Sequence, residues 1–122
     1  MDFAEMRGRA LEVRALYADW EVRRDGRAWS ATELMNGFTG DVGDLAKLVG
    51  AHAGSRPGPE DLPAALGHEL ADCLWSVLVI ADAVGVDLEQ AFTSTMNDLE
   101  DHVRAQLAIE DPVRRTPGSS DQ

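Results

Sequence analysis

Two pairs of acidic residues are the strongest candidates for chemistry in this chain. The first pair is Asp41 and Asp44, and the second is Glu69 and Asp72. Residues three apart on a helix project from the same side, so each pair predicts two neighbouring carboxylates. Removing a lone carboxylate from water is costly unless it is paired or bound to a metal ion. The surroundings of these acids therefore decide what they indicate.

Both pairs interrupt apolar helical surfaces. At 100° per residue, Asp41 falls inside a broad apolar face. That face consists of Leu34, Phe38, Val42, Leu45, Leu48 and Val49. The segment 70–83 is apolar almost all round, and its polar stripe is limited to Glu69, Asp72 and Ser76. A helix with this profile is expected in the middle of a core. The sequence therefore places carboxylates where only a counter-charge would make them stable.

A divalent cation is the expected counter-charge. If the two helices pack antiparallel, the acid pairs could face each other across them. Carboxylate oxygens without accompanying Cys or His favour Mg²⁺ or Mn²⁺ over zinc. We therefore predict that Asp41, Asp44, Glu69 and Asp72 hold Mg²⁺, with Mn²⁺ as the alternative. No Glu-x-x-His motif occurs, so a ferritin-like di-iron site is not supported.

Four helices are expected to position these acids. Apolar residues recur at helical spacing over 2–24, and the run Asp25-Gly26-Arg27 breaks this pattern. A capping box, Ser30 to Glu33, begins a second helix that runs to about residue 51. A Gly- and Pro-rich loop over 54–59 precedes a third helix, which stops at Gly85. Asp87 caps a fourth helix that runs to about residue 109. The predicted class is all-α, an antiparallel bundle of about four helices.

Length and charge narrow the classes of function. The chain has 122 residues, which fits one domain over 1–110 that dimerisation would complete, followed by a disordered C-terminal tail over 111–122. A net charge of −11 argues against binding to nucleic acid polymers and anionic membranes. The longest strongly apolar run, 77–81, is too short to cross a bilayer. Cys73 is the only cysteine, which fits a reducing cytoplasm, and no signal pattern opens the chain.

Three motifs, in this order, resemble those of the MazG-like, all-α nucleoside triphosphate pyrophosphatases. They are Asp-Val-Gly-Asp-Leu-Ala from Asp41, Glu-Leu-Ala-Asp-Cys-Leu-Trp from Glu69, and Gly-Val-Asp-Leu-Glu-Gln-Ala-Phe from Gly85. That family is marked by Glu-x-x-Glu on one helix and Glu-x-x-Asp on the next. The similarity extends from about Trp29 to Val103.

The resemblance implies a Mg²⁺-dependent enzyme that splits a nucleoside triphosphate into monophosphate and pyrophosphate. It implies that the four acids serve as both metal ligands and catalytic residues, and that the enzyme is a cytoplasmic homodimer or homotetramer acting on nucleotide pools. The chain departs from the family pattern in three places. Asp stands for Glu at both positions of the first motif, Gly40 replaces a frequent acid, and Asn97 is followed by acidic rather than basic residues.

Two other functions stay open from the sequence. The Asp-for-Glu changes and the acidic fourth helix also suit a non-catalytic helical module that binds a metal or nucleotide for regulation. The same hydrolytic chemistry could also act on another phosphoanhydride, such as a phosphoribosyl nucleotide. The sequence identifies neither the nucleobase of the substrate nor the residue that acts as general base in the reaction.

Three further residues are candidates for substrate binding, each with a structural alternative. Lys47, the only lysine, could reach a phosphate oxygen or pair with an acid. Trp29 could stack on a nucleobase or act as a hydrophobic staple before the second helix. Asn97 could contact substrate or be a surface amide. His68 adjoins Glu69 but lies about 100° away around the helix, so we expect it outside the metal site.

Glycines recur every third residue beside the first acid pair, at Gly37, Gly40 and Gly43. Each lowers helix stability by about 1 kcal/mol relative to Ala, which calls for a reason. They could allow close helix packing, or they could leave open space for a ligand beside the acids.

Overall fold

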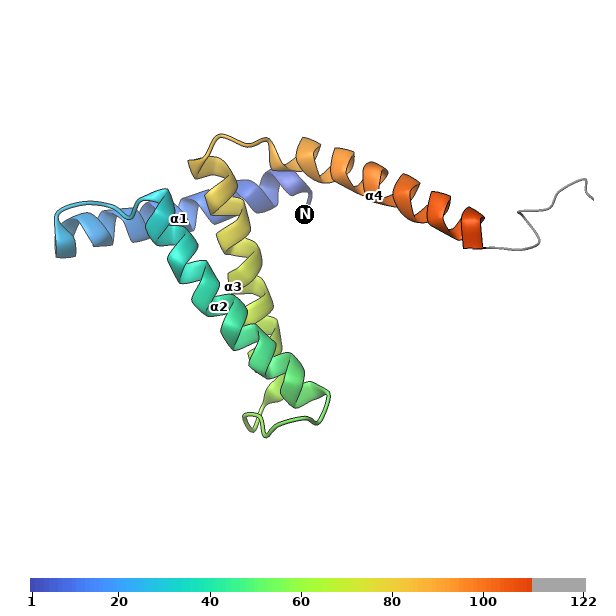
Figure 1. Cartoon of the computed structure of the whole chain (residues 1–122). Coiled ribbons are helices and arrows are strands. Elements are labelled where there is room, and N and C mark those ends of the chain that lie inside the picture. Colours follow the sequence, from blue (N-terminus) through green and yellow to red (C-terminus); the bar gives the residue numbers. More distant parts are fainter. Residues whose placement is uncertain (111–122) are drawn as a thin grey trace, which may run out of the picture. The chain divides into compact units, whose positions relative to one another are not determined.

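The computed structural model describes residues 1–110 of the chain, and they form four α-helices. These are α1 (Phe3–Asp25), α2 (Ala31–His52), α3 (Leu62–Ala83) and α4 (Leu88–Glu110), which Figure 1 labels along the chain. The described residues contain no β-strand, so the prediction of an all-α fold with four helices is confirmed. The tail predicted over 111–122 lies outside the described residues.

The chain divides into two compact units. The first, Met1–Val86, holds α1, α2 and α3, and the second begins at Asp87 and holds α4. The acidic motifs all lie in the first unit. The prediction of a single domain over 1–110, completed by a partner subunit, stays a prediction.

The helix ends are set by the residues that the sequence marked. Ser30 and Glu33 form the full capping box: the Ser30 hydroxyl accepts the Glu33 N–H, and the Glu33 carboxylate accepts the Ser30 N–H at 3.1 Å. Asp61 caps α3, and the Asp87 side chain accepts the Gln90 N–H at 3.1 Å at the start of α4. Residues that follow α1 and α3, Gly26 and Gly85, adopt the left-handed backbone that ends a helix. These five helix ends therefore follow from local chemistry.

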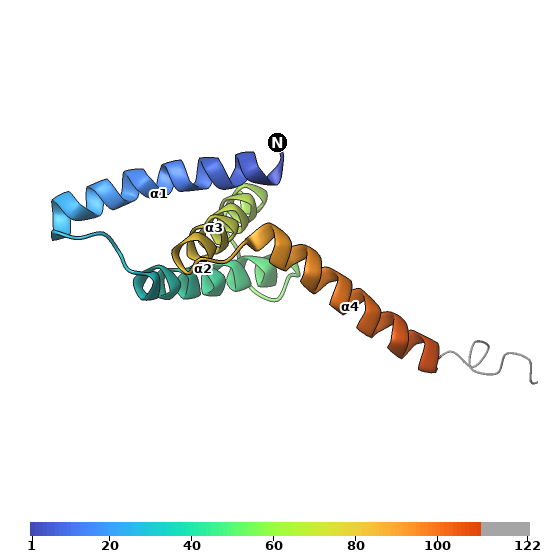
Figure 2. The same ribbon diagram turned by 90° about the horizontal axis from the view of Figure 1, so that it is seen from above.

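The helices α2 and α3 run antiparallel, side by side, and the loop over 53–61 joins them (Figures 1 and 2). The face of α2 toward α3 is a half-buried stripe of Leu34, Phe38, Asp41, Leu45 and Leu48. Val42 and Val49, predicted in this face, are 45% and 52% exposed. They lie 60–80° from the centre of the stripe on the 100° wheel, beyond what one neighbouring helix covers. The apolar face of α2 is therefore narrower than predicted.

The other neighbour of α3 is α1. The Trp75 indole N–H donates to the backbone carbonyl of Ala10 at 3.1 Å, and an exposed ion pair joins Arg7 to Asp82 at 2.8 Å. The buried apolar residues of the unit all belong to these two helices: Ala10, Leu78, Val79 and Ala81. The core is small, and α3 contributes most of it.

The prediction that α3 lies in the middle of a core is wrong for part of its surface. Leu70, Leu74 and Val77 are 54%, 46% and 37% exposed, because only two helices of the unit cover α3. By length and composition α3 is also apolar enough to cross a membrane, a test that core helices of soluble proteins pass as well. Glu69 and Asp72 lie in the middle of this apolar helix.

Candidate functional site

Three of the four predicted acids come together between α2 and α3. Asp41, Glu69 and Asp72 each offer a carboxylate oxygen, and the three oxygens lie within 4.8 Å of one another. All three residues are half-buried. We call these residues the acidic trio. The prediction that acids from two helices would face each other is correct for this trio.

Asp44 is the predicted ligand that the structure leaves outside the trio. Its side chain is exposed, because it lies about 60° around α2 from Asp41, on the edge away from α3. Its charge still acts on the site, where it helps to raise the pKa values of Asp41 and Glu69. Asp44 is therefore placed beside the acidic trio and not within it.

Glu69 is the least satisfied member of the trio. Its Oε2 atom is buried and has no hydrogen-bond partner among the residues that the structure describes. Burial is the main cause that raises the pKa of Glu69, and the charges of Asp41, Asp72 and Asp44 raise it further. Burial also raises the pKa of Asp41, with Asp72 as the next cause. Three crowded carboxylates with an unpartnered buried oxygen form a donor set that fits a hard divalent cation.

His68 contacts the trio from the solvent side. Its Nε2 atom lies 3.2 Å from an Asp72 carboxylate oxygen, and the imidazole is 75% exposed. Its positive charge, when protonated, opposes the rise in the pKa values of Asp41 and Glu69. His68 therefore lies beside Asp72 but is not a member of the trio, and its exclusion from a metal site stays a prediction.

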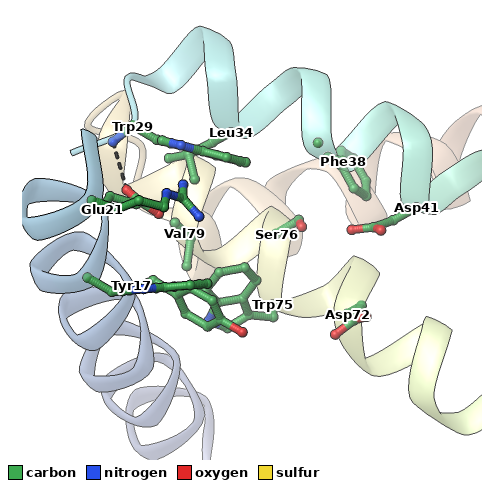
Figure 3. Close-up of a pocket in the computed structure, with 13 residues that line it drawn as sticks. Tyr17, Glu21, Trp29, Leu34, Phe38, Asp41, Asp72, Trp75, Ser76 and Val79 are labelled. Carbon is green, nitrogen blue, oxygen red and sulfur yellow. Dashed lines mark hydrogen bonds between the residues drawn. The ribbon is translucent and has the colours of Figure 1, made fainter. Parts of the chain in front are cut away.

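A cavity of about 310 Å³ opens beside the trio. Asp41 and Asp72 lie at one end of it, and Glu21 and Trp29 at the other, as Figure 3 shows. Its lining residues come from α1, α2, α3 and the α1–α2 loop: Tyr17, Trp20, Glu21, Arg24, Trp29, Leu34, Gly37, Phe38, Asp41, Asp72, Trp75, Ser76 and Val79. The cavity therefore joins an acidic end to an aromatic end.

Aromatic rings form much of the wall away from the acids. The Tyr17 ring lies 5.6 Å from that of Trp75 and 6.1 Å from that of Trp20, in tilted arrangements. The Arg24 guanidinium lies 4.7 Å from the centre of the Trp20 ring, in cation–π contact. Such a surface suits a planar, polarisable group such as a nucleobase.

Of the three predicted substrate-binding residues, the structure brings one to this cavity. Trp29 lines it. Lys47 is exposed on α2, forms no ion pair within residues 1–110, and does not line the cavity. Asn97 lies on α4, in the second unit, and is exposed. For Lys47 and Asn97 a role in binding stays a prediction.

The glycines beside Asp41 are explained by open space rather than by close helix packing. A Cβ atom built on Gly40 or Gly43 would meet nothing within 4 Å among the described residues. A Cβ atom on Gly37 would lie 3.6 Å from the Trp29 ring, and Gly37 lines the cavity. The packing alternative is therefore wrong for these glycines within the described residues.

Sequence reasoning missed the part of the cavity that α1 supplies. Tyr17 and Trp20 count as ordinary apolar positions in the helical repeat of residues 2–24. A signal was present in Arg14 and Glu21, two opposite charges that share one helix face with Ala10 and Tyr17. Charged residues on a buried helix face need specific partners. Here Arg14 and Glu21 pair with each other, and both also bind the backbone of Trp29.

Comparison with known proteins finds relatives that are named dCTP pyrophosphatase 1. The chain is 34% identical to dCTP pyrophosphatase 1 of Mus musculus over an alignment of 91 residues that covers 70% of this chain and 54% of that protein. It is 31% identical to dCTP pyrophosphatase 1 of Homo sapiens over 102 residues, 80% of this chain and 60% of that protein. The chain thus spans a little over half the length of these relatives. No family model matches the chain.

Proposed function

The chain is homologous to dCTP pyrophosphatase 1, and from this premise we propose that it is a Mg²⁺-dependent nucleoside triphosphate pyrophosphohydrolase. The reaction is (d)NTP + H₂O to (d)NMP + pyrophosphate: water attacks the α-phosphorus, and the bond to the bridging α–β oxygen breaks. The observation that carries the proposal is the acidic trio at one end of an aromatic cavity.

The two ends of the cavity suit the two ends of a nucleotide. The rings of Tyr17, Trp20, Trp29 and Trp75 offer stacking surfaces for the base. A nucleotide bound in this way would direct its phosphates toward Asp41 and Asp72. The buried Ser76 hydroxyl lies along the wall between them. Because the relatives are named for dCTP, this nucleotide is the first substrate to test.

The acidic end cannot meet a triphosphate unaided, because both are negatively charged and the chain carries a net charge of −11. Asp41, Glu69 and Asp72 are the residues that would hold Mg²⁺, or Mn²⁺, and the exposed Asp44 adds its negative charge from beside them. Bound there, such a cation supplies neutralisation of phosphate charge and acidification of water. The protein's own contribution is to hold these carboxylates together and to align the nucleotide with them.

The test is a panel of dNTPs, NTPs and a phosphoribosyl nucleotide, incubated with the full chain and Mg²⁺ or Mn²⁺. Pyrophosphate and orthophosphate are measured separately, because pyrophosphate alone reports cleavage between the α- and β-phosphates. We expect pyrophosphate and the monophosphate in equal amounts, with dCTP among the substrates. If no member of the panel releases pyrophosphate, the proposal is contradicted. Cation-dependent nucleotide binding without turnover supports the regulatory module instead.

A matched pair of variants on α3 links turnover to the trio. Asp72→Asn removes one carboxylate of the trio and should lower kcat at least about a hundredfold. Asp82→Asn is the same substitution on the same helix, where it breaks only an exposed ion pair with Arg7. It should leave kcat within about twofold of the unaltered protein. Equal losses in the two variants would disconnect turnover from the trio.

A further inference from the structure

A buried ion pair lies on α1 at the aromatic end of the cavity. Arg14 Nη1 lies 3.0 Å from Oε1 and 3.2 Å from Oε2 of Glu21. The Arg14 and Glu21 side chains are only 14% and 6% exposed. The removal of two charges from water is compensated only when geometry is good and further hydrogen bonds form. Arg14 and Glu21 each form a further hydrogen bond, and these bonds show which part of the chain the pair positions.

Both members of the pair bind the backbone of one residue, Trp29. Glu21 Oε1 accepts the Trp29 N–H at 2.7 Å, the bond dashed in Figure 3, and Arg14 Nη2 donates to the Trp29 carbonyl at 3.0 Å. The backbone of Trp29 is thus bonded to α1 through both its N–H and its C=O. The side chain of the residue so fixed is part of the cavity wall.

The start of α2 has its own contacts and does not depend on this pair. The Ser30–Glu33 capping box covers the first amides of α2. An exposed ion pair from Arg27 to Glu33, with a contact of 2.6 Å, bridges the same loop. What Arg14 and Glu21 add is the position of Trp29 itself. Glu21 itself lines the cavity, whereas Arg14 is not among the lining residues.

We propose that the Arg14–Glu21 pair is a positioning device, which fixes the Trp29 ring as a wall of the nucleotide cavity and thereby sets nucleotide affinity. This inference rests on the proposed function, which supplies the nucleotide ligand. It assigns a role in nucleotide binding to two residues that lie away from the acidic end of the cavity. Arg14 and Glu21 act through Trp29 and not on the reacting atoms. Their loss should therefore raise KM and spare kcat.

The first test is the steady-state kinetics of Glu21→Gln with dCTP and Mg²⁺. The Gln carbonyl can still accept the Trp29 N–H, but the charge that holds Arg14 is gone. We expect KM to rise about tenfold and kcat to stay within about twofold. Arg27→Gln is the matched control, because it breaks an exposed ion pair of the same loop without a contact to Trp29. It should leave KM unchanged.

A second readout needs no nucleotide and separates this inference from the proposed function. The near-ultraviolet circular dichroism of the protein minus that of Trp29→Phe isolates the signal of an immobilised Trp29. In the Glu21→Gln background the same difference should shrink, because the ring is no longer held. This comparison keeps its meaning even if no nucleotide is turned over, an outcome that would refute the proposed function alone.

Arg14→Lys serves as the second variant if Glu21→Gln does not fold. Lysine keeps the positive charge, but its single ammonium cannot reproduce the fork that contacts both Glu21 and the Trp29 carbonyl. It should give an intermediate rise in KM and an intermediate loss of the Trp29 signal. The inference is overturned if the variants keep the original KM and dichroism, or if kcat falls while KM stays constant.

Discussion

Asp41 on α2 and Asp72 on α3 place carboxylate oxygens within 4.8 Å of each other, and each residue belongs to a different helix of an antiparallel pair. The charge of Asp72 helps to raise the pKa of Asp41, so the two helices repel each other at this point. A cation held between them would reverse the sign of that interaction. Helix pairing and cation binding are therefore expected to be coupled.

Mg²⁺ or Mn²⁺ should raise the melting temperature of the full chain, and the variants should rank by their distance from the trio. Asp72→Asn should abolish most of the rise, since it removes one carboxylate of the trio. Asp44→Asn should reduce it less, because Asp44 is exposed and outside the trio. Calorimetry across a series of cation concentrations measures both. A larger effect from Asp44 than from Asp72 would contradict the arrangement described.

The stability of the cation-free protein should fall as the pH rises through the mildly acidic range. Raised carboxyl pKa values, as in Glu69 and Asp41, favour the folded state while these groups are protonated. That contribution is complete below the ordinary carboxyl pKa of about 4 and is lost as the pH passes the raised values. Glu69→Gln cannot ionise and should show a smaller fall when melting temperature is measured against pH.

Glu33 gives the opposite slope and must be separated from this effect. Its hydrogen bonds to Arg27 and Ser30 lower its pKa to about 2, so its contribution is present near neutrality and lost as the pH falls. Because Glu33 is unchanged in Glu69→Gln, its contribution cancels in the difference between the two curves. Parallel curves for the two proteins would show that ionisation of Glu69 does not destabilise the folded protein.

Gly37 and Gly40 should respond alike to alanine and differently to leucine. Neither glycine has a close neighbour that a methyl group would displace, so each alanine should stabilise α2 by about 1 kcal/mol. Gly37→Leu places a branched side chain at the cavity wall and should raise KM for dCTP about tenfold or more. Gly40→Leu points into open space and serves as the control. Equal kinetics for the two leucine variants would place the nucleotide elsewhere.

Leu78→Ala and Leu70→Ala make the same chemical change at a buried and at an exposed position of α3. Leu78 is 3% exposed, and its truncation should lower the free energy of unfolding by about 2–5 kcal/mol. Leu70 is 54% exposed, and its truncation should cost about 1 kcal/mol or less. Urea denaturation of both variants measures the difference. A large loss at Leu70 would indicate that this face is covered in solution.

The sequence predicted the features that depend on short-range chemistry. The capping box at Ser30, the cap at Asp87 and the breaks at Gly26 and Gly85 give helix ends within one or two residues of those observed. The spacing of Asp41, Glu69 and Asp72 places three carboxylates on facing surfaces. These patterns depend only on the periodicity of a helix and on the antiparallel course that a short loop imposes.

What the sequence did not reveal depends on how widely a neighbouring helix covers a face. Val42 and Leu70 are as hydrophobic as buried residues, but they lie outside the strips that the adjoining helices cover. Asp44 is likewise separated from the trio by a rotation of about 60°. The role of α1 was hidden for another reason: Tyr17 and Trp20 have the same spacing whether they fill a core or line a cavity.

The distribution of the cavity's lining over separate segments has an evolutionary consequence. The carboxylates come from α2 and α3, whereas Tyr17, Trp20 and Glu21 come from α1 and Trp29 from the loop that follows it. Under the proposed function, substitutions in the first thirty or so residues could retune which base is accepted while the hydrolytic centre stays intact. Selectivity and catalysis would then be inherited as partly separable traits, because only Trp75 among the proposed stacking rings shares a helix with the acidic trio.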